Sequence, residues 1–149
     1  MDLYRRQVSC LHRHCTLRLY EALKSCGLAV PKPEGAFYVY PSFYPYREQL
    51  RKMGIHTSHD LSRWLITEFG IAALPGSAFG EDDNGLLGGC YRLRMASSYL
   101  YFSDQVERYS YGYELLQLAC KSDATIKLPM LEEAIAAIRN AVDVVKKAS

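Results

Sequence analysis

Two arginines, Arg92 and Arg94, are the side chains of this sequence best suited to binding a ligand. They lie in the segment 91–96, where apolar and basic residues alternate. Because successive side chains of a strand point to opposite faces, a strand here presents both guanidinium groups on one face. A guanidinium is a planar fork of donors that holds a carboxylate through two hydrogen bonds, which lysine does not reproduce. The alternative is a solvated face, or pairing with one of the nearby acids: Glu81, Asp82, Asp83 and Asp104.

The segment 74–80, with the sequence LPGSAFG, is a second candidate. It places Gly76 and Gly80 in a loop that follows a short apolar run. Glycine permits positive φ and a close approach of the backbone to a ligand, which suits a binding loop. The alternative is an ordinary turn, for which the same composition is typical.

Cysteine and histidine residues cluster at residues 10–15. On a helix, Cys10 neighbours His14 and His12 neighbours Cys15, and both residue types are zinc ligands. The two pairs lie on different helix faces and do not close one tetrahedral site, so we expect surface histidines and no metal. The chain's five cysteines are odd in number and scattered, which favours free thiols in a reducing compartment.

An aromatic segment at residues 35–40, GAFYVY, superficially matches the aromatic strand of RNA-recognition-motif domains. In that pattern a basic residue precedes the glycine, whereas Glu34 precedes it here. A net charge of +2 is also too small for a chain built to bind phosphate backbones. We therefore expect no nucleic-acid partner.

The hydrophobic pattern predicts the elements that position these candidates. Periodic apolar residues predict helices over residues 11–23, 57–70, 104–118 and 129–145, with a short helix inside the irregular segment 41–56. Strand-forming residues predict strands at 36–40, 71–74 and 91–96. One small sheet covered by helices is the simplest architecture that buries these faces.

Length and composition indicate one ordinary globular domain. The chain has 149 residues, of which 49% are hydrophobic and 23% charged. No run approaches the roughly 18 consecutive apolar residues of a membrane span, and the first residues, MDLYRRQ, lack an apolar signal core. We expect a cytoplasmic protein with no membrane partner. The 12 tyrosines predict many half-buried sites, because a buried hydroxyl needs a partner.

Three segments, in this order and spacing, resemble the C-terminal small domain of the class I/II aminotransferases, which are pyridoxal-phosphate enzymes of fold type I. They are PEGAFY at 33–38, LPGSAFG at 74–80 and RLRMA at 92–96. The resemblance runs from the first predicted helix through the last. It implies an α/β fold of the α+β two-layer type, with a sheet of three to four strands covered by helices. It assigns residues 1–149 to the small domain, with the large cofactor-binding domain absent.

The resemblance also implies a role for one arginine. In the family, the arginine of an R-x-x-x-A strand motif binds the α-carboxylate of the substrate. That arginine corresponds to Arg92 here, with Ala96 as the alanine of the motif. Arg94 lies on the same predicted face and is our second choice for substrate binding. The loop 75–80 and the strand containing Phe37 are implied to lie near the active-site cleft.

In the complete enzyme, the resemblance implies pyridoxal phosphate bound covalently to a lysine of the large domain. None of the seven lysines here stands in that sequence context. We therefore expect this chain to hold no catalytic or cofactor-binding residue and to bind no cofactor alone. The predicted function is the C-terminal portion of an enzyme acting on amino acids and 2-oxo acids, inactive by itself.

The alternative is a non-enzymatic interaction or regulatory module that keeps the small-domain fold. Family members are commonly homodimers, while the oligomeric state of this chain and its amino acid substrate stay open.

Overall fold

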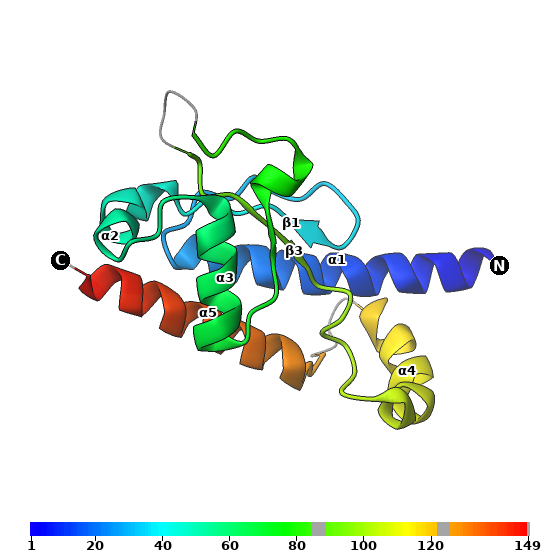
Figure 1. Ribbon diagram of the computed structural model, residues 1–149. Helices are drawn as coiled ribbons and strands as arrows, with labels where there is room; N and C mark the ends of the chain where they lie inside the picture. Colours follow the sequence, from blue (N-terminus) through cyan, green and yellow to red (C-terminus); the bar gives the residue numbers. More distant parts are fainter. Residues whose placement is uncertain (85–88, 122–125, 149) are drawn as a thin grey trace.

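Figure 1 shows a computed structural model that describes residues 1–84, 89–121 and 126–148. The helices are α1 (Asp2–Ser25), α2 (Arg47–Lys52), α3 (Ser58–Phe69), α4 (Gln105–Ala119) and α5 (Pro129–Lys147). The strands are β1 (Tyr38–Val39), β2 (Leu74–Pro75) and β3 (Leu93–Ala96), and the 3-10 helices are η1 (Tyr44–Tyr46) and η2 (Gly76–Phe79). The predicted order of helices and strands is confirmed. The loop expected from Gly76 to Gly89 begins with η2, and its residues 85–88 lie outside the described part.

The three strands form one antiparallel sheet with β3 in the centre. The order is β1-β3-β2, and both pairings are antiparallel. Tyr38 pairs with Ala96 on one side, and Leu74 pairs with Arg94 on the other. The predicted small sheet with helical cover is therefore confirmed, and the segments that carry the candidate residues lie side by side in it.

The strands are shorter than the sequence predicts, for local reasons. Ala36 has a φ of 60°, so extended backbone begins only after it. The segment before Leu74 bonds to a helix instead of a strand, since the Ser62 hydroxyl of α3 donates to the Ala73 carbonyl at 2.6 Å. Tyr91 has a φ of 47°, which delays β3 to Leu93.

Helix α1 buries the predicted face and extends further toward the N-terminus than predicted. The residues of that face are all buried: Leu11, Cys15, Leu19, Ala22 and Leu23. The helix ends where Gly27 takes a φ of 84°, a left-handed conformation that costs glycine little.

Helix α3 begins and ends as its sequence predicts. The Thr57 hydroxyl accepts from the Asp60 backbone N–H at 3.0 Å, and the Asp60 carboxylate accepts from the Thr57 N–H at 3.2 Å. This reciprocal capping box satisfies two backbone donors at the start of the helix. Gly70 closes the helix in a left-handed conformation.

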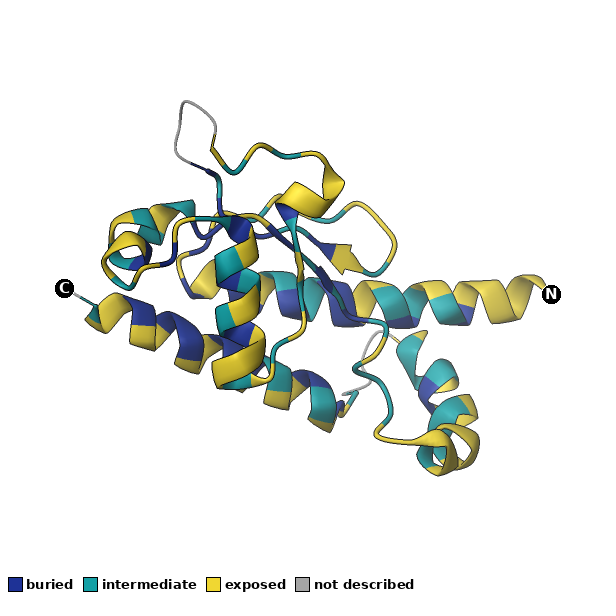
Figure 2. Cartoon of the chain, in the orientation of Figure 1, coloured by how far each residue is buried: buried dark blue, intermediate teal, exposed yellow. Residues whose placement is uncertain are grey.

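The core lies between one face of the sheet and the long helices. Tyr91, Leu93 and Met95 are buried, whereas the alternate residues Arg92 and Arg94 are not, as the alternation predicts. The apolar stripe of α5 faces inward and its opposite side is exposed (Figure 2). Helix α4 packs beside the N-terminal half of α1 (Figure 1). Among the described helices, none is both long and apolar enough to cross a membrane.

Candidate functional site

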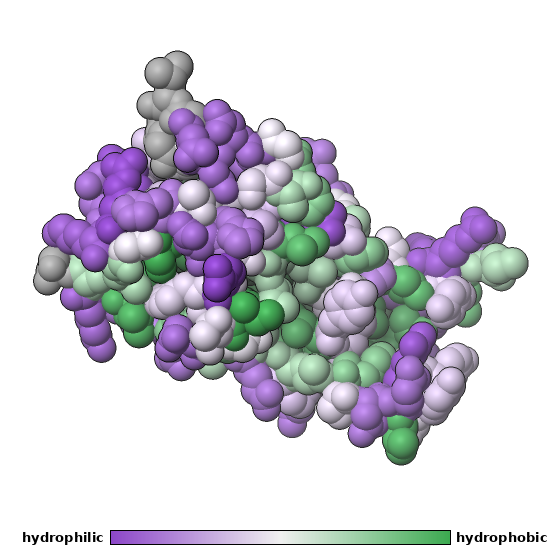
Figure 3. All heavy atoms as spheres, viewed as in Figure 1, coloured by the Kyte–Doolittle hydropathy of each residue, from purple (hydrophilic) through white to green (hydrophobic). Residues whose placement is uncertain are grey.

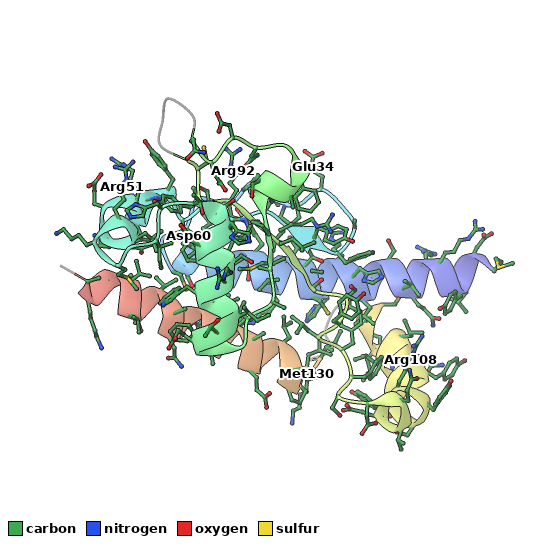
Figure 4. All side chains as sticks on the ribbon, in the orientation of Figure 1. Glu34, Arg51, Asp60, Arg92, Arg108 and Met130 are labelled. Carbon is green, nitrogen blue, oxygen red and sulfur yellow. The ribbon has the colours of Figure 1, made fainter. Side chains whose placement is uncertain are left out.

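Arg92 lies on the solvent side of the sheet beside η2 (Figure 4). The preceding residue, Tyr91, sets its position. Its ring is buried, and its hydroxyl donates to the Ile55 carbonyl at 3.0 Å. This anchoring holds Tyr91 at positive φ, an uncommon conformation for a bulky residue, and Arg92 follows directly. The carbonyl of Arg92 then accepts from the Gly76 N–H at 2.8 Å, which fixes its backbone to the LPGSAFG loop.

The guanidinium of Arg92 binds a carboxylate of this chain. Nη1 donates to Oε1 of Glu81 at 2.7 Å, the short distance of a charge-assisted hydrogen bond. The side chain of Arg92 is 44% exposed and that of Glu81 is 28% exposed. Among the four acids that the sequence offers as partners, Glu81 is therefore the one that Arg92 contacts.

Gly76 makes room for this pair. A Cβ atom at this position would lie 2.5 Å from Oε2 of Glu81 and 2.9 Å from the hydroxyl of Tyr40. Both distances are too short for a real carbon atom, so the carboxylate and the hydroxyl approach here because the residue is glycine. The close approach predicted for this loop exists, and in this structure it accommodates a glutamate of the chain itself.

The charges of the cluster are mutually consistent. The hydrogen bond to Glu81 raises the pKa of Arg92 above its ordinary value. Burial, and after it the negative charge of Glu81, raises the pKa of the Tyr40 hydroxyl. At neutral pH the cluster therefore contains a guanidinium cation, hydrogen-bonded to Glu81, and a neutral phenol. Tyr40 belongs to the predicted strand 36–40 and is half-buried, as expected for the tyrosines, and its spacing of two from Tyr38 predicts the same face.

Arg94 has a different environment on the same face of the sheet. Its guanidinium carbon lies 4.5 Å from the ring centre of Tyr38 and 4.3 Å from that of Phe79. Both distances are within the range of cation–π attraction. Among the described residues, no carboxylate forms an ion pair with Arg94. Arg94 thus bridges β1 and η2 across the central strand.

The loop that carries Glu81 is tied to α3 as well. The Asp83 carboxylate accepts from the Ser58 backbone N–H at 3.0 Å and from the Ser58 hydroxyl at 2.9 Å. A carboxylate at the first turn of a helix is favoured by the helix dipole. The loop is therefore held at Gly76, Glu81 and Asp83, which restricts where Glu81 can reach.

An apolar groove of about 940 Å³ begins next to Arg94. It lies between the end of α3, the sheet and α5, and its lining includes Phe69, Leu74 and Met130. Figure 3 shows hydrophobic side chains gathering on this face between α3 and α4. The sheet thus presents a polar cluster around Arg92 and an apolar hollow beyond Arg94.

The cysteine and histidine cluster of α1 differs in part from its prediction. His14 is exposed, as expected for a surface histidine. His12 is half-buried, with Nδ1 2.5 Å from the hydroxyl of Tyr101, and burial lowers its pKa. Phe37, the first aromatic residue of the GAFYVY segment, packs against His12. In the described part of the chain, no three potential metal ligands come together.

The described residues do not fit pyridoxal phosphate. A lysine that forms a covalent bond with a carbonyl cofactor needs a lowered pKa, which burial or a neighbouring cation provides. All seven lysines here are exposed. None of them lines the groove beside Arg94 or contacts the Arg92 cluster. Among the described residues, Arg92 thus contacts a carboxylate, and no lysine lies beside it or in the groove.

Comparison with known proteins connects this geometry to one class of enzyme. The family model "Aminotransferase class I and II" matches residues 11–99, which include both arginines, Glu81 and the three motifs. A probable N-acetyl-LL-diaminopimelate aminotransferase of Bacillus subtilis (strain 168) is 40% identical over 67 residues, 45% of this chain and 15% of that protein. An aspartate aminotransferase of Pyrococcus abyssi (strain GE5 / Orsay) is 30% identical over 90 residues, 60% of this chain and 20% of that protein.

The fold is similar to a solved structure as well. The crystal structure of an aromatic aminotransferase from Pyrococcus horikoshii OT3 matches with a TM-score of 0.54 and 22% identity. The match covers 91% of this chain and 25% of the chain of that enzyme. This likeness concerns the fold. The chain spans only 15% to 20% of the length of the two relatives above, and α4 and α5 lie outside the matched residues.

Proposed function

Because this chain belongs to the class I and II aminotransferase family, we propose that it is the C-terminal small domain of a pyridoxal-phosphate-dependent aminotransferase. Two observations support this placement: the three motifs lie within the family match, and the fold likeness extends over 91% of the chain. Amino acids and 2-oxo acids are the substrates of this family. Transamination itself belongs to a protein of the relatives' full length.

In this function Arg92 binds the α-carboxylate of the substrate. The observation that carries the proposal is the Arg92–Glu81 pair, in which the guanidinium already holds a carboxylate at 2.7 Å on an accessible face. A substrate carboxylate has the same charge and the same oxygen geometry as Glu81. It replaces Glu81 on Arg92 without creating an unpaired cation. Arg94 is the second candidate, since it lies on the same face and has no described carboxylate partner.

The direct test is carboxylate binding to the chain, followed by NMR of arginine side-chain N–H groups. Pyruvate is the probe, and its methyl ester, which lacks the carboxylate, is the matched control. Because water screens an exposed pair, one such interaction supplies only about 0.2–1 kcal/mol, so the expected Kd is on the order of hundreds of millimolar. Binding should shift the Arg92 signals and be lost in Arg92→Lys, because an ammonium group does not reproduce the bidentate fork.

Arg94→Lys is the control for the choice between the two arginines. Pyruvate binding should survive this substitution. Loss of binding in Arg94→Lys with retention in Arg92→Lys would transfer the role to Arg94. If pyruvate and its ester behave alike, the face binds no carboxylate, and a non-enzymatic module with the small-domain fold becomes the better description.

A second test addresses the cofactor. We expect the chain alone to form no stoichiometric lysine bond with pyridoxal phosphate and to catalyse no transamination, because its lysines are exposed. Borohydride reduction of a mixture, followed by intact-mass analysis, measures this. Scattered, substoichiometric labelling of several lysines is expected, and a single fully labelled lysine would contradict the proposal.

A further inference from the structure

A hollow of about 560 Å³ lies where helices α1 and α4 and the segment that leads into α4 meet. Aromatic rings line it: Tyr4 comes from α1, and Tyr99, Tyr101 and Phe102 come from the segment before α4. Small-molecule sites in proteins have volumes of about 300–1,000 Å³ and are mostly lined by apolar and aromatic side chains with a few polar groups. The hollow therefore has the size and the lining of such a site.

Specific contacts hold two of these rings in place. Nδ1 of His12 lies 2.5 Å from the hydroxyl of Tyr101, which fixes the Tyr101 ring against α1. The rings of Tyr101 and Phe102 meet edge to face, with their centres 6.5 Å apart. Phe102 in turn lies against α4 at Gly112, where a Cβ atom would be 3.5 Å from Cζ of the ring. A ligand in the hollow therefore meets rings that are already ordered, which lowers the entropic cost of binding.

Helix α4 brings a cation to the hollow from its inner side. Arg108 lines the hollow and precedes the fully buried Leu115 by seven residues. Seven residues are close to two helical turns, so the two side chains leave the helix on the same side. Figure 4 shows Arg108 on α4. Among the described residues, no carboxylate forms an ion pair with Arg108.

The two acids closest to Arg108 in the sequence bond to other groups. The Asp104 carboxylate caps α4 by accepting from the Glu107 N–H at 2.8 Å. The Glu107 carboxylate accepts from the N–H and the hydroxyl of Ser103, both at 2.6 Å. Asp104 also lines the hollow, but its charge is offset by the positive end of the helix dipole. The guanidinium of Arg108 is therefore the group of this hollow best placed to bind an anion.

We propose that this hollow is a binding site for a small aromatic carboxylate. The ligand ring packs against Tyr101 and Phe102, since aromatic rings attract one another in offset and edge-to-face arrangements. The ligand carboxylate accepts from Arg108, whose planar fork of donors matches its two oxygens. An aliphatic acid would make no ring contacts, and an aromatic cation would be repelled by Arg108.

This site is separate from the one assigned to substrate. None of the residues in the Arg92 cluster lines the hollow, and helix α4 lies beyond the residues that the family model matches. The proposal therefore stands or falls independently of the proposed function.

A titration of the chain with 4-fluorophenylacetate, followed by ¹⁹F NMR, tests the proposal. A ligand of this size binds a fitting site with a Kd on the order of millimolar, far tighter than the binding of pyruvate expected at Arg92. The uncharged reference is 2-(4-fluorophenyl)ethanol, which keeps the ring and lacks the carboxylate. It should bind about 1.4- to 5-fold more weakly, which is the contribution of one exposed ion pair.

Four variants separate the ring contacts from the ion pair. Arg108→Gln should weaken the acid by the same factor and leave the alcohol unchanged. Arg139→Gln, which alters an exposed arginine of α5 outside the hollow, should change neither. Tyr4→Ser should weaken both probes. Its matched control, Tyr109→Ser, alters a tyrosine that is 84% exposed and does not line the hollow, and it should weaken neither.

Intermolecular NOEs locate the bound ring. Contacts with the methyl groups of Val8 and Leu116, which line the hollow, are expected. Contacts with Leu74 or Met130 would place the ring in the groove beside Arg94 and overturn the proposal. Equal affinity for the acid and the alcohol, or no binding of the acid at tens of millimolar, would also overturn it. Arg92→Lys should remove pyruvate binding and leave the binding of 4-fluorophenylacetate intact, so failure of either proposal is recognised separately.

Discussion

Replacing Glu81 by glutamine tests whether Arg92 exchanges its carboxylate partner. In the structure, Glu81 occupies the guanidinium that the proposed function assigns to substrate. A substrate carboxylate must therefore displace Glu81 before it binds. Glutamine keeps the size of the side chain and one accepting oxygen, but it removes the negative charge that competes for Arg92.

The magnitude follows from the exposure of the pair. The side chains of Arg92 and Glu81 are 44% and 28% exposed, so water screens their attraction. Pairs of this kind contribute about 0.2–1 kcal/mol, and breaking the pair adds that cost to substrate binding. Removing the competing charge should therefore improve carboxylate affinity by about 1.4- to 5-fold, because 1.4 kcal/mol corresponds to a tenfold change.

The assay is a pyruvate titration of the wild-type and Glu81→Gln chains, with the methyl ester as the uncharged reference. Glu132→Gln is a matched control, since it breaks another exposed arginine–glutamate pair, Arg18–Glu132 at 2.8 Å, on a different face. The control should bind pyruvate like the wild type. Weaker binding in Glu81→Gln would refute the reasoning, because it would mean that Glu81 holds Arg92 in its binding position and does not compete with the ligand.

Three further changes test the surrounding structure. Gly76→Ala should push the Glu81 carboxylate and the Tyr40 hydroxyl apart and lower stability by about 1–3 kcal/mol in urea unfolding, with an unchanged midpoint as the contrary result. Thr57→Ala should remove one side of the α3 capping box and cost about 1 kcal/mol, whereas Thr57→Ser should cost much less. Burial raises the pKa of Cys15 from 9.0 to about 12, so the contribution of this thiol to stability is full below pH 9 and falls as pH rises toward 12. Between pH 9 and 10 the loss should be roughly 1 kcal/mol, and Cys15→Ala should remove that slope.

The helices of this fold are predictable from sequence because each has its own periodic signal. The buried face of α1, the Thr57 cap with Gly70 at the other end of α3, and the stripe of α5 all appear where predicted. The strands are less predictable in extent. The sheet pairs only two residues of β1 and two of β2, and such short pairings depend on where β3 lies. A positive φ at Ala36 has no marker in the sequence, since alanine rarely adopts it.

The sequence predicts which residue types form the candidate site, but it does not predict which side chains the two arginines contact. Alternation within 91–96 correctly places Arg92 and Arg94 on one face. Sequence does not choose among four nearby acids, because that choice depends on how the loop after η2 is tied down. The bond from Asp83 to Ser58 sets that path, and it joins residues from different elements. The contact of Arg94 with Phe79 has the same origin, since it requires η2 to fold back over the sheet.

The environments of the two arginines explain why Arg92 is the better candidate for exchange with a ligand. Arg92 is held by one carboxylate at the end of a flexible side chain, and a ligand carboxylate can take over that interaction oxygen for oxygen. Arg94 is held by two ring faces at 4.5 and 4.3 Å, and these contacts depend on its guanidinium staying between β1 and η2. If a ligand drew Arg94 out of this position, Arg94 would lose both ring contacts. Helix η2, which leads into the loop containing Glu81, would then be held less firmly. We therefore expect Arg94 to keep the loop in place while Arg92 changes partner. Arg94→Lys should weaken the protection of the η2 amides from hydrogen exchange, whereas pyruvate binding should change little.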